Sequence, residues 1–213
     1  YNGYFNGNES LKAGVKKLHL NHIDDFTTTI PVFPAGDLKK AKKIHPSMTR
    51  AIKKGSVVIQ RHSMKINGVE YCKWIDDNYL MVGKSYFYKG EFDEAIKTFS
   101  YINNEYKNNE IRFNALLWLI RSYTEKRDYS SALFLINELK NDRNFPKKFE
   151  KDLSLNTADL FIQKKDFISA ESELRNLLGL IKSKRKKVRI NYILAQLYQY
   201  SNNYALAKKH YKL

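Results

Sequence analysis

The sequence YLMVGKSYFYKGEFDEAIKTF at residues 79–99 contains two apolar patterns of helical period on either side of a glycine. Its second pattern begins with GEFDEA at residues 90–95, in which an aromatic residue stands three positions before an alanine. The same arrangement recurs as RDYSSA at 127–132, KDFISA at 165–170 and NNYALA at 202–207. The alanines of the four motifs are 37, 38 and 37 residues apart. A constant period of this size is typical of stacked helical hairpins, one in each repeat.

This period predicts an all-α fold in which an α-solenoid of helical hairpins follows a less regular N-terminal helical segment. The N-terminal segment is expected over residues 1–69 and the solenoid over residues 70–213. The four expected repeats lie at about 75–107, 112–144, 150–182 and 187–213. A solenoid presents an extended surface for binding, so the fold favours an interaction function over catalysis.

The first repeat resembles the tetratricopeptide repeat in the spacing of a small residue, an aromatic, an alanine and a second aromatic. These residues are Gly83, Tyr86, Ala95 and Phe99. The repeat of that family is nearer to 34 residues, so the additional residues are expected to lengthen helix ends or connections. The resemblance is specific for the fold and indicates no particular function.

The first 69 residues lack the repeat. A helix is expected from Asn8 to about His19, with Gly7 in a turn that follows the end of an earlier helix. Residues 26–45 contain three threonines, two prolines and a lysine-rich stretch, which predicts a linker or an excursion from the helical core. A further helix is expected from Pro46 to about His62.

The chain is strongly basic, with 38 Lys and Arg against 22 Asp and Glu and a formal net charge of +16. Such a charge suggests nucleic acid or an acidic membrane as a partner. The lysines are scattered over nearly every expected helix, however, which is more typical of a solvated surface. The densest basic run, residues 182–189, falls between two repeats, where an exposed turn is expected, and contact with anionic lipid or an acidic protein stays open.

No arrangement of residues in the sequence indicates a catalytic or metal site. His19 and His22, with Asp24 and Asp25, have a spacing that would suit a metal, but no cysteine or third histidine stands nearby, and an exposed helix end is the favoured interpretation. Glycine-rich phosphate motifs, paired catalytic acids and Ser-His-Asp spacing are absent from the sequence. The single cysteine, Cys72, excludes an internal disulfide. We therefore expect no enzyme activity, no cofactor, no metal and no small-molecule substrate.

The expected binding surface is the inner face of the repeats, which the first helix of each hairpin lines. Apolar and polar side chains mixed on one face suit an extended peptide or a partner helix. By helical phase, the candidate contact residues are Asp77, Leu80, Lys84, Phe87, Asn114, Leu117, Arg121, Thr124, Asp152, Leu155, Asp159, Ile162, Arg189, Tyr192, Gln196 and Gln199. Leu80 and Lys84 occupy positions that the carboxylate clamp of chaperone-binding repeats fills differently, so that subfamily is not expected.

Three stretches outside the repeat pattern carry a more specific resemblance. They are YFNGNESLKAG at residues 4–14, AIKK at 51–54 leading into HSMKING at 62–68, and IDDNYLMVGKSYFY at 75–88. In this order they resemble the N-terminal region of the PorW/SprE family, which are tetratricopeptide lipoproteins of the Bacteroidetes type 9 secretion and gliding-motility machinery. The resemblance covers about residues 1–100.

The resemblance implies a protein–protein interaction scaffold on the periplasmic side of the outer membrane. Its partners would be proteins of the secretion complex, namely the outer-membrane translocon and components of the periplasmic motor-associated ring. Membrane contact would come from a lipid anchor upstream of Tyr1, because Cys72 lies in an expected helix and has no lipobox. The alternatives are a tetratricopeptide-like nucleic-acid-binding protein and a generic peptide-binding adaptor. Nucleic acid ranks lower, since the four inner faces share no base-binding code.

Overall fold

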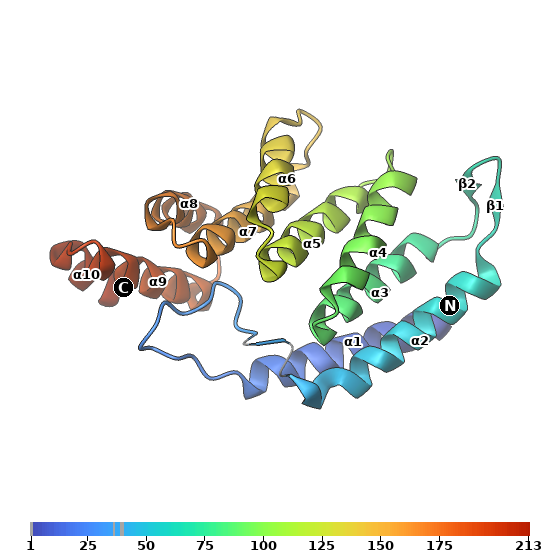
Figure 1. Ribbon diagram of the computed structural model, residues 1–213, viewed down its shortest axis with the longest axis horizontal. Coiled ribbons are helices and arrows are strands. Elements are labelled where there is room, and N and C mark those ends of the chain that lie inside the picture. Colours follow the sequence, from blue (N-terminus) through green and yellow to red (C-terminus); the bar gives the residue numbers. More distant parts are fainter. Residues whose placement is uncertain (1, 36, 39–40) are drawn as a thin grey trace. The chain divides into compact units, whose positions relative to one another are not determined.

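The protein is all-α, as predicted (Figure 1). The computed structural model describes residues 2–35, 37–38 and 41–213, so Tyr1 and, in the expected linker, Gly36, Lys39 and Lys40 lie outside the described residues. The α-helices are α1 (Asn2–Asn21), α2 (His45–His62), α3 (Ile75–Lys89), α4 (Phe92–Glu105), α5 (Ile111–Lys126), α6 (Tyr129–Asn141), α7 (Glu150–Gln163), α8 (Phe167–Leu180), α9 (Lys184–Tyr200) and α10 (Tyr204–Tyr211). The described residues also form the short 3-10 helices η2 (Lys42–Ile44) and η3 (Lys147–Phe149) and an antiparallel pair of strands, β1 (Lys65–Ile66) and β2 (Val69–Glu70).

The chain forms two compact units. Unit 1 consists of Tyr1–His22 and Ala35–Lys126, and unit 2 consists of Ile23–Pro34 and Arg127–Leu213. In unit 1, α1 and α2 pack along each other and against α3, and the α3–α4 hairpin packs against α5. In unit 2, α7 pairs with α8 and α9 pairs with α10. The boundary expected after residue 69 thus falls inside unit 1, because the N-terminal helices pack against the first repeat.

The repeated motif forms a turn and the start of the helix that follows it. Its first residue has a positive φ, which is 81° at Gly90 and 64°, 63° and 58° at Arg127, Lys165 and Asn202. In the last three motifs the next residue is an N-cap whose side chain accepts a hydrogen bond from the backbone N–H three residues on. The alanine that follows is buried in all four motifs. The period therefore reflects a turn, a helix cap and a buried packing position.

Two glycines of unit 1 permit close helix packing. A Cβ on Gly83 would lie 2.5 Å from the ring of Phe99, which explains the small residue at this position of the tetratricopeptide spacing. A Cβ on Gly7 would lie 2.7 Å from the Cε of Met81. The prediction of a turn at Gly7 is wrong, because α1 continues through it and the missing side chain allows α1 to approach α3.

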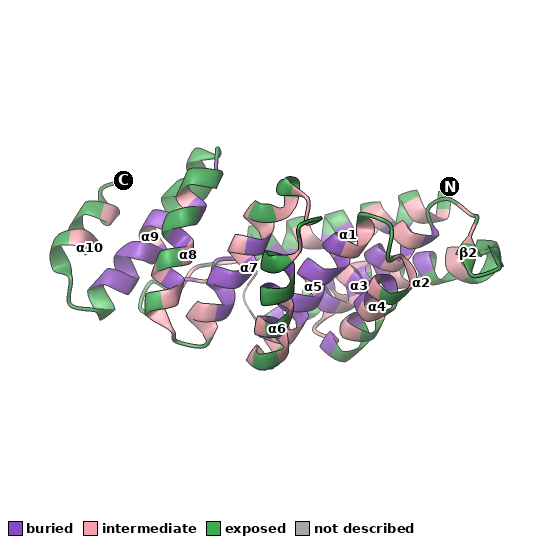
Figure 2. Cartoon of the chain, turned by 90° about the horizontal axis from the view of Figure 1, so that it is seen from above, coloured by how far each residue is buried: buried purple, intermediate pink, exposed green. Residues whose placement is uncertain are grey.

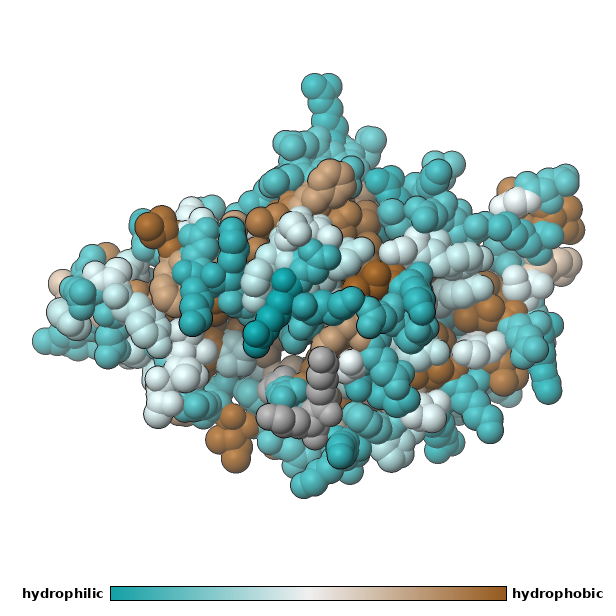
Figure 3. Space-filling view, viewed as in Figure 1, coloured by the Kyte–Doolittle hydropathy of each residue, from teal (hydrophilic) through white to brown (hydrophobic). Residues whose placement is uncertain are grey.

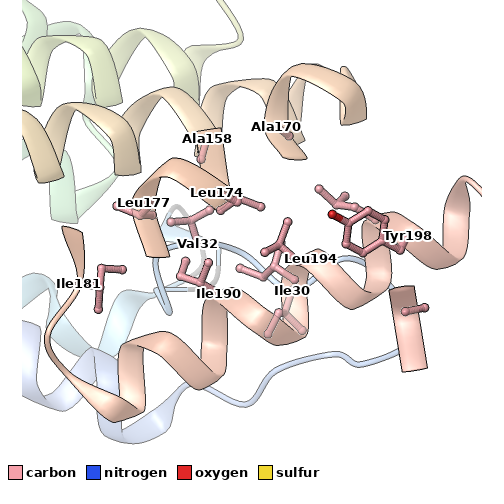
Figure 4. Packing of buried hydrophobic residues seen from close by; sticks show 13 residues of the cluster. Ile30, Val32, Ala158, Ala170, Leu174, Leu177, Ile181, Ile190, Leu194 and Tyr198 are labelled. Carbon is pink, nitrogen blue, oxygen red and sulfur yellow. The ribbon is translucent and has the colours of Figure 1, made fainter. Parts of the chain in front are cut away.

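Unit 2 has a hydrophobic core formed mainly by α7, α8 and α9, with the buried residues of α9 between Ile190 and Tyr198 (Figure 2). A non-helical stretch, Ile23–Pro34, completes this core, and we call it the bound segment. Ile30 and Val32 are 3% and 5% exposed and belong to the same cluster as Leu174 and Leu194 (Figure 4). Much of the expected linker is therefore a packed part of unit 2.

Candidate functional site

Helix α9 contacts the bound segment through polar side chains along one side of the helix. Ile190 and Leu194 point into the core at helical spacing. Arg189, Tyr192 and Gln196 are three and four residues apart, so they lie along one side of the helix. We call these three residues the α9 site.

Gln196 binds the main chain of the bound segment at two points. Its Nε2 donates to the carbonyl oxygen of Thr28 at 2.7 Å, and its Oε1 accepts from the backbone N–H of Ile30 at 3.0 Å. The Gln196 side chain is buried, and these bonds satisfy backbone groups that folding removes from water. Main-chain bonds of this kind do not depend on the sequence of the bound peptide.

Arg189 binds both a side chain and a carbonyl group of the bound segment. Its two terminal nitrogens donate to the two carboxylate oxygens of Asp24, each at 2.7 Å. Its Nε and Nη2 donate to the carbonyl oxygen of Pro31 at 3.0 and 2.8 Å. The Arg189 and Asp24 side chains are 20% and 17% exposed. A bidentate pair of opposite charges gives both geometric selectivity and a stronger bond than neutral groups give.

Side chains of the bound segment fill the remaining positions. Ile30 and Val32 alternate along the chain, so both enter the core while Pro31 between them stays half-buried. The ring of Phe26 meets Tyr192 edge-on with 5.3 Å between centroids. The α9 site and the adjoining core thus hold a carboxylate, an aromatic ring, three main-chain groups and two aliphatic side chains.

The other predicted residues of unit 2 have different surroundings. Leu155 and Ile162 are partly buried and pack against the core cluster. Asp159 is buried and accepts a hydrogen bond from Gln163. Asp152 is half-buried beside Lys151, and exposed Gln199 accepts from the hydroxyl of Tyr211 at 3.0 Å. Of the predicted inner face in this unit, three residues of α9 bind the segment.

In unit 1, two predicted cations gather around a tryptophan. The guanidinium of Arg121 lies 4.7 Å from the Trp118 ring centroid and 4.8 Å from that of Phe87. The ammonium of Lys84 lies 5.3 Å from the Trp118 ring centroid. Trp118 also packs edge-on against Phe87 and Tyr88 at 5.2 and 5.6 Å. We call these five residues the Trp118 cluster.

The Trp118 cluster changes the titration of its lysine. Burial lowers the pKa of Lys84 to about 8, the carboxylate of Asp77 opposes the shift, and the charge of Arg121 adds to it. Burial and the neighbouring Asp76 raise the pKa of Asp77, and Lys84 opposes that shift. The ring faces supply part of the stabilisation that water gives an exposed cation.

Fewer residues of unit 1 are accessible on its inner face than helical phase predicts. Four of its predicted members, Leu80, Phe87, Leu117 and Thr124, are buried inside the unit. The hydroxyl of Thr124 donates to a backbone carbonyl one turn earlier in α5, which occupies its polar group. Asp77, Lys84, Asn114 and Arg121 are half-buried and remain as the accessible part of this face.

Several contact residues were missed by reasoning from the sequence. Trp118 stands three positions before Arg121, a spacing at which helical side chains meet. Phe26 gave no signal, and Asp24 was considered only as a metal ligand beside the two histidines. The alternation of Ile30 and Val32 could have indicated a half-buried extended strand.

The structure also locates the residues that were considered for metal binding and lipidation. His19 is in the last turn of α1. Within the described part of the chain, no group of three or more His, Cys, Asp or Glu is placed to hold a metal ion. Cys72 lies in the turn between β2 and α3, so its expected helical position is wrong, because α3 begins only at Ile75 after the left-handed Trp74. Within the described residues, no helix combines the length and apolar character needed to cross a bilayer.

No protein-family model matches the chain, and no curated protein matches it.

Proposed function

We propose that the protein is a protein–protein interaction scaffold whose inner helix faces bind non-helical segments of partner proteins. The observation that carries this proposal is the set of bonds from Arg189 and Gln196 to the main chain of the bound segment. Main-chain bonds supply affinity for a peptide, and pockets for alternate side chains supply selectivity. The α9 site combines both. The proposal includes no catalysis, cofactor or small-molecule substrate.

The resemblance to the PorW/SprE family supports a cellular setting for this scaffold. The stretches that carry the resemblance form parts of α1, α2, the β1–β2 hairpin and α3, all in unit 1. They also meet in space, since a Cβ on Gly7 would lie 2.7 Å from the Cε of Met81 and 3.3 Å from the Cβ of Lys54. We therefore propose a lipid-anchored outer-membrane protein that faces the periplasm and links the translocon to the motor-associated ring.

Affinity purification from native membranes tests this proposal. The tagged protein, cross-linked in cells before lysis, is expected to recover outer-membrane translocon and periplasmic ring proteins. A matched variant, Arg189→Ala with Gln196→Ala, shows whether the α9 site contributes to that recovery. Fractionation of the protein with the cytosol, or recovery of neither complex, would contradict the proposed setting.

Nucleic-acid binding is a second candidate with one observation in its favour. Residues 184–188 at the start of α9 are all exposed, and four of them are Lys or Arg. The face in Figure 3 is hydrophilic over most of its area, as expected for charge dispersed over many helices. A salt titration with DNA or RNA distinguishes the two candidates, because binding through phosphates requires a log–log slope of several units. Absence of binding at low salt eliminates the second candidate.

A further inference from the structure

We propose that the bound segment occupies the site of a partner peptide, and that this site selects peptides with the same chemistry. The inference rests on the proposed scaffold function and names its ligand class. The expected ligand has an acidic residue six positions before the first of two alternating aliphatic residues, as Asp24 precedes Ile30 and Val32. An aromatic residue two positions after the acid completes the pattern.

The bound segment packs in one unit, but both of its ends are covalently joined to the other unit. Ile23–Pro34 belongs to unit 2, whereas the chain on both sides, up to His22 and from Ala35, belongs to unit 1. Hydrogen bonds join it to α9 residues between 158 and 168 positions away in the sequence. Unit 2 therefore holds the segment by non-covalent contacts, as a peptide receptor does.

The contacts select by chemistry as well as by shape. Arg189 matches a carboxylate, and the first turn of α9 contains no acidic residue, so the surroundings of Asp24 favour negative charge. Tyr192 matches an aromatic ring, and the core accepts aliphatic side chains at alternate positions. The turn at residues 25–28 is made by the segment itself, since the Asp25 carboxylate accepts from the backbone N–H of Thr27 at 3.0 Å.

The bound segment also lies where a partner peptide can replace it. Ile23 and Phe26 are 88% and 61% exposed, so part of the segment is open to solvent. Leu174, Leu177 and Ile193 of the helices beneath are fully buried in the same core cluster as Ile30 and Val32. Because the segment is tethered, it competes for the site at an effective concentration on the order of millimolar. A partner peptide must therefore bind the site more tightly than the segment does, or bind when the contacts of the segment have been weakened.

Binding of a labelled peptide to the whole chain tests this inference. The probe is a fluorescein-labelled peptide with the sequence of residues 23–34, followed by anisotropy. Asp24→Asn in the protein weakens the tethered segment and leaves the α9 site intact. We expect this variant to bind the probe about tenfold more tightly than the wild type, since one charge-assisted pair is lost from the competitor alone. Adding Arg189→Ala to the variant should abolish the gain.

Asp25→Asn is the matched control. It removes the same charge one residue away, and asparagine can still make the local turn. Equal probe affinity of the two variants, or no binding to either at millimolar probe, overturns the inference. If Asp24→Asn loses its helical circular dichroism, Phe26→Ala takes its place with the same expectation, and unfolding of both variants makes the segment a structural part of unit 2.

The oligomeric state and the recovered proteins show which molecule occupies the site. A wild-type dimer that becomes a monomer on Asp24→Asn would identify a second copy as the source of the segment and overturn the partner-peptide inference. Recovery of secretion proteins by the wild type without any probe binding keeps the scaffold proposal and rejects this site. Probe binding without such recovery supports the site and leaves its partner outside that machinery.

Discussion

The inner faces of the two units use equivalent repeat positions for different purposes. Lys84 and Arg121 of unit 1 stand at the position that Gln196 holds in unit 2. In unit 1 both side chains lie against the ring of Trp118, so packing within the unit engages them. In unit 2, Gln196 instead binds the backbone of a distant segment. The helix hairpin thus determines which positions point inward, and the neighbouring residues determine whether those positions stabilise the unit or bind a peptide.

The largest expected effect tests the packing role in unit 1. Trp118→Ala removes a ring that contacts Phe87, Tyr88 and Phe99 as well as two cations. We expect a loss of about 3 kcal/mol in the free energy of unfolding, measured with urea, since large-to-small changes leave cavities and unmatched contacts. Phe134→Ala, at an exposed position of α6, is the control and should change stability by less than about 0.5 kcal/mol. A loss from Trp118→Ala as small as the control's would mean that the cluster does not hold unit 1 together.

The next effect tests the binding role in unit 2. Arg189→Ala leaves the Pro31 carbonyl without its guanidinium donors and removes the bidentate partner of Asp24. We expect a loss of about 2 kcal/mol, with faster hydrogen exchange at the amide of Ile30, because bonds to charged groups contribute about this much. Arg189→Lys should restore only part of it, because an ammonium cannot bind both oxygens in parallel. The exposed Arg185→Ala serves as control, and equal exchange rates in all variants would contradict a holding role for Arg189.

The sequence predicts the features that neighbouring residues determine, and it does not predict contacts between residues far apart in the chain. The turns and helix starts were predictable because each motif contains its own turn residue and buried alanine within six positions, and the last three motifs also contain a capping side chain. Arg189, Tyr192 and Gln196 were predictable as a stripe because helical phase is also local. The segment they bind was not, since threonines and prolines are typical of linkers and its partner helix is more than 150 residues away.

Glycine shows the same limit at a single position. Gly7 and Gly90 are alike in a sequence, but Gly90 has a φ of 81° in a turn whereas Gly7 lies inside a helix against Met81. Only the packing of another helix distinguishes the two uses. Trp118 is a similar case, because its role depends on α3 side chains that approach it from the preceding hairpin.

Titration of Lys84 sharpens the contrast between a packed cation and a binding residue. Its pKa is about 8 in the folded state, below the ordinary 10.5, so the unfolded chain binds more protons between these values. The contribution of Lys84 to stability should therefore rise as pH increases from about 8 to 10.5 and stay constant below 8. Lys84→Met should remove this rise and stabilise the protein by about 1 kcal/mol at pH 7, because no buried charge remains. The measurement is the difference in unfolding free energy between wild type and variant at several pH values. A constant difference would mean that Lys84 is solvated.

The smallest expected effect concerns the start of α9, which carries the binding stripe. Its first turn contains Lys184, Arg185, Lys186 and Lys187, although the N-terminal end of a helix favours negative charge. Lys184→Glu should therefore stabilise unit 2 by about 0.5 kcal/mol at low ionic strength, and salt should reduce the gain. Lys208→Glu, in the last turn of α10, is the matched control and should have the opposite sign, since basic residues are favourable at a helix C-terminus. If Lys184→Glu stabilises the protein but weakens recovery of an acidic partner, the basic turn serves attraction of that partner at the expense of helix stability. A gain in stability with no change in recovery would assign partner selection to Arg189 and leave the basic turn without a part in it.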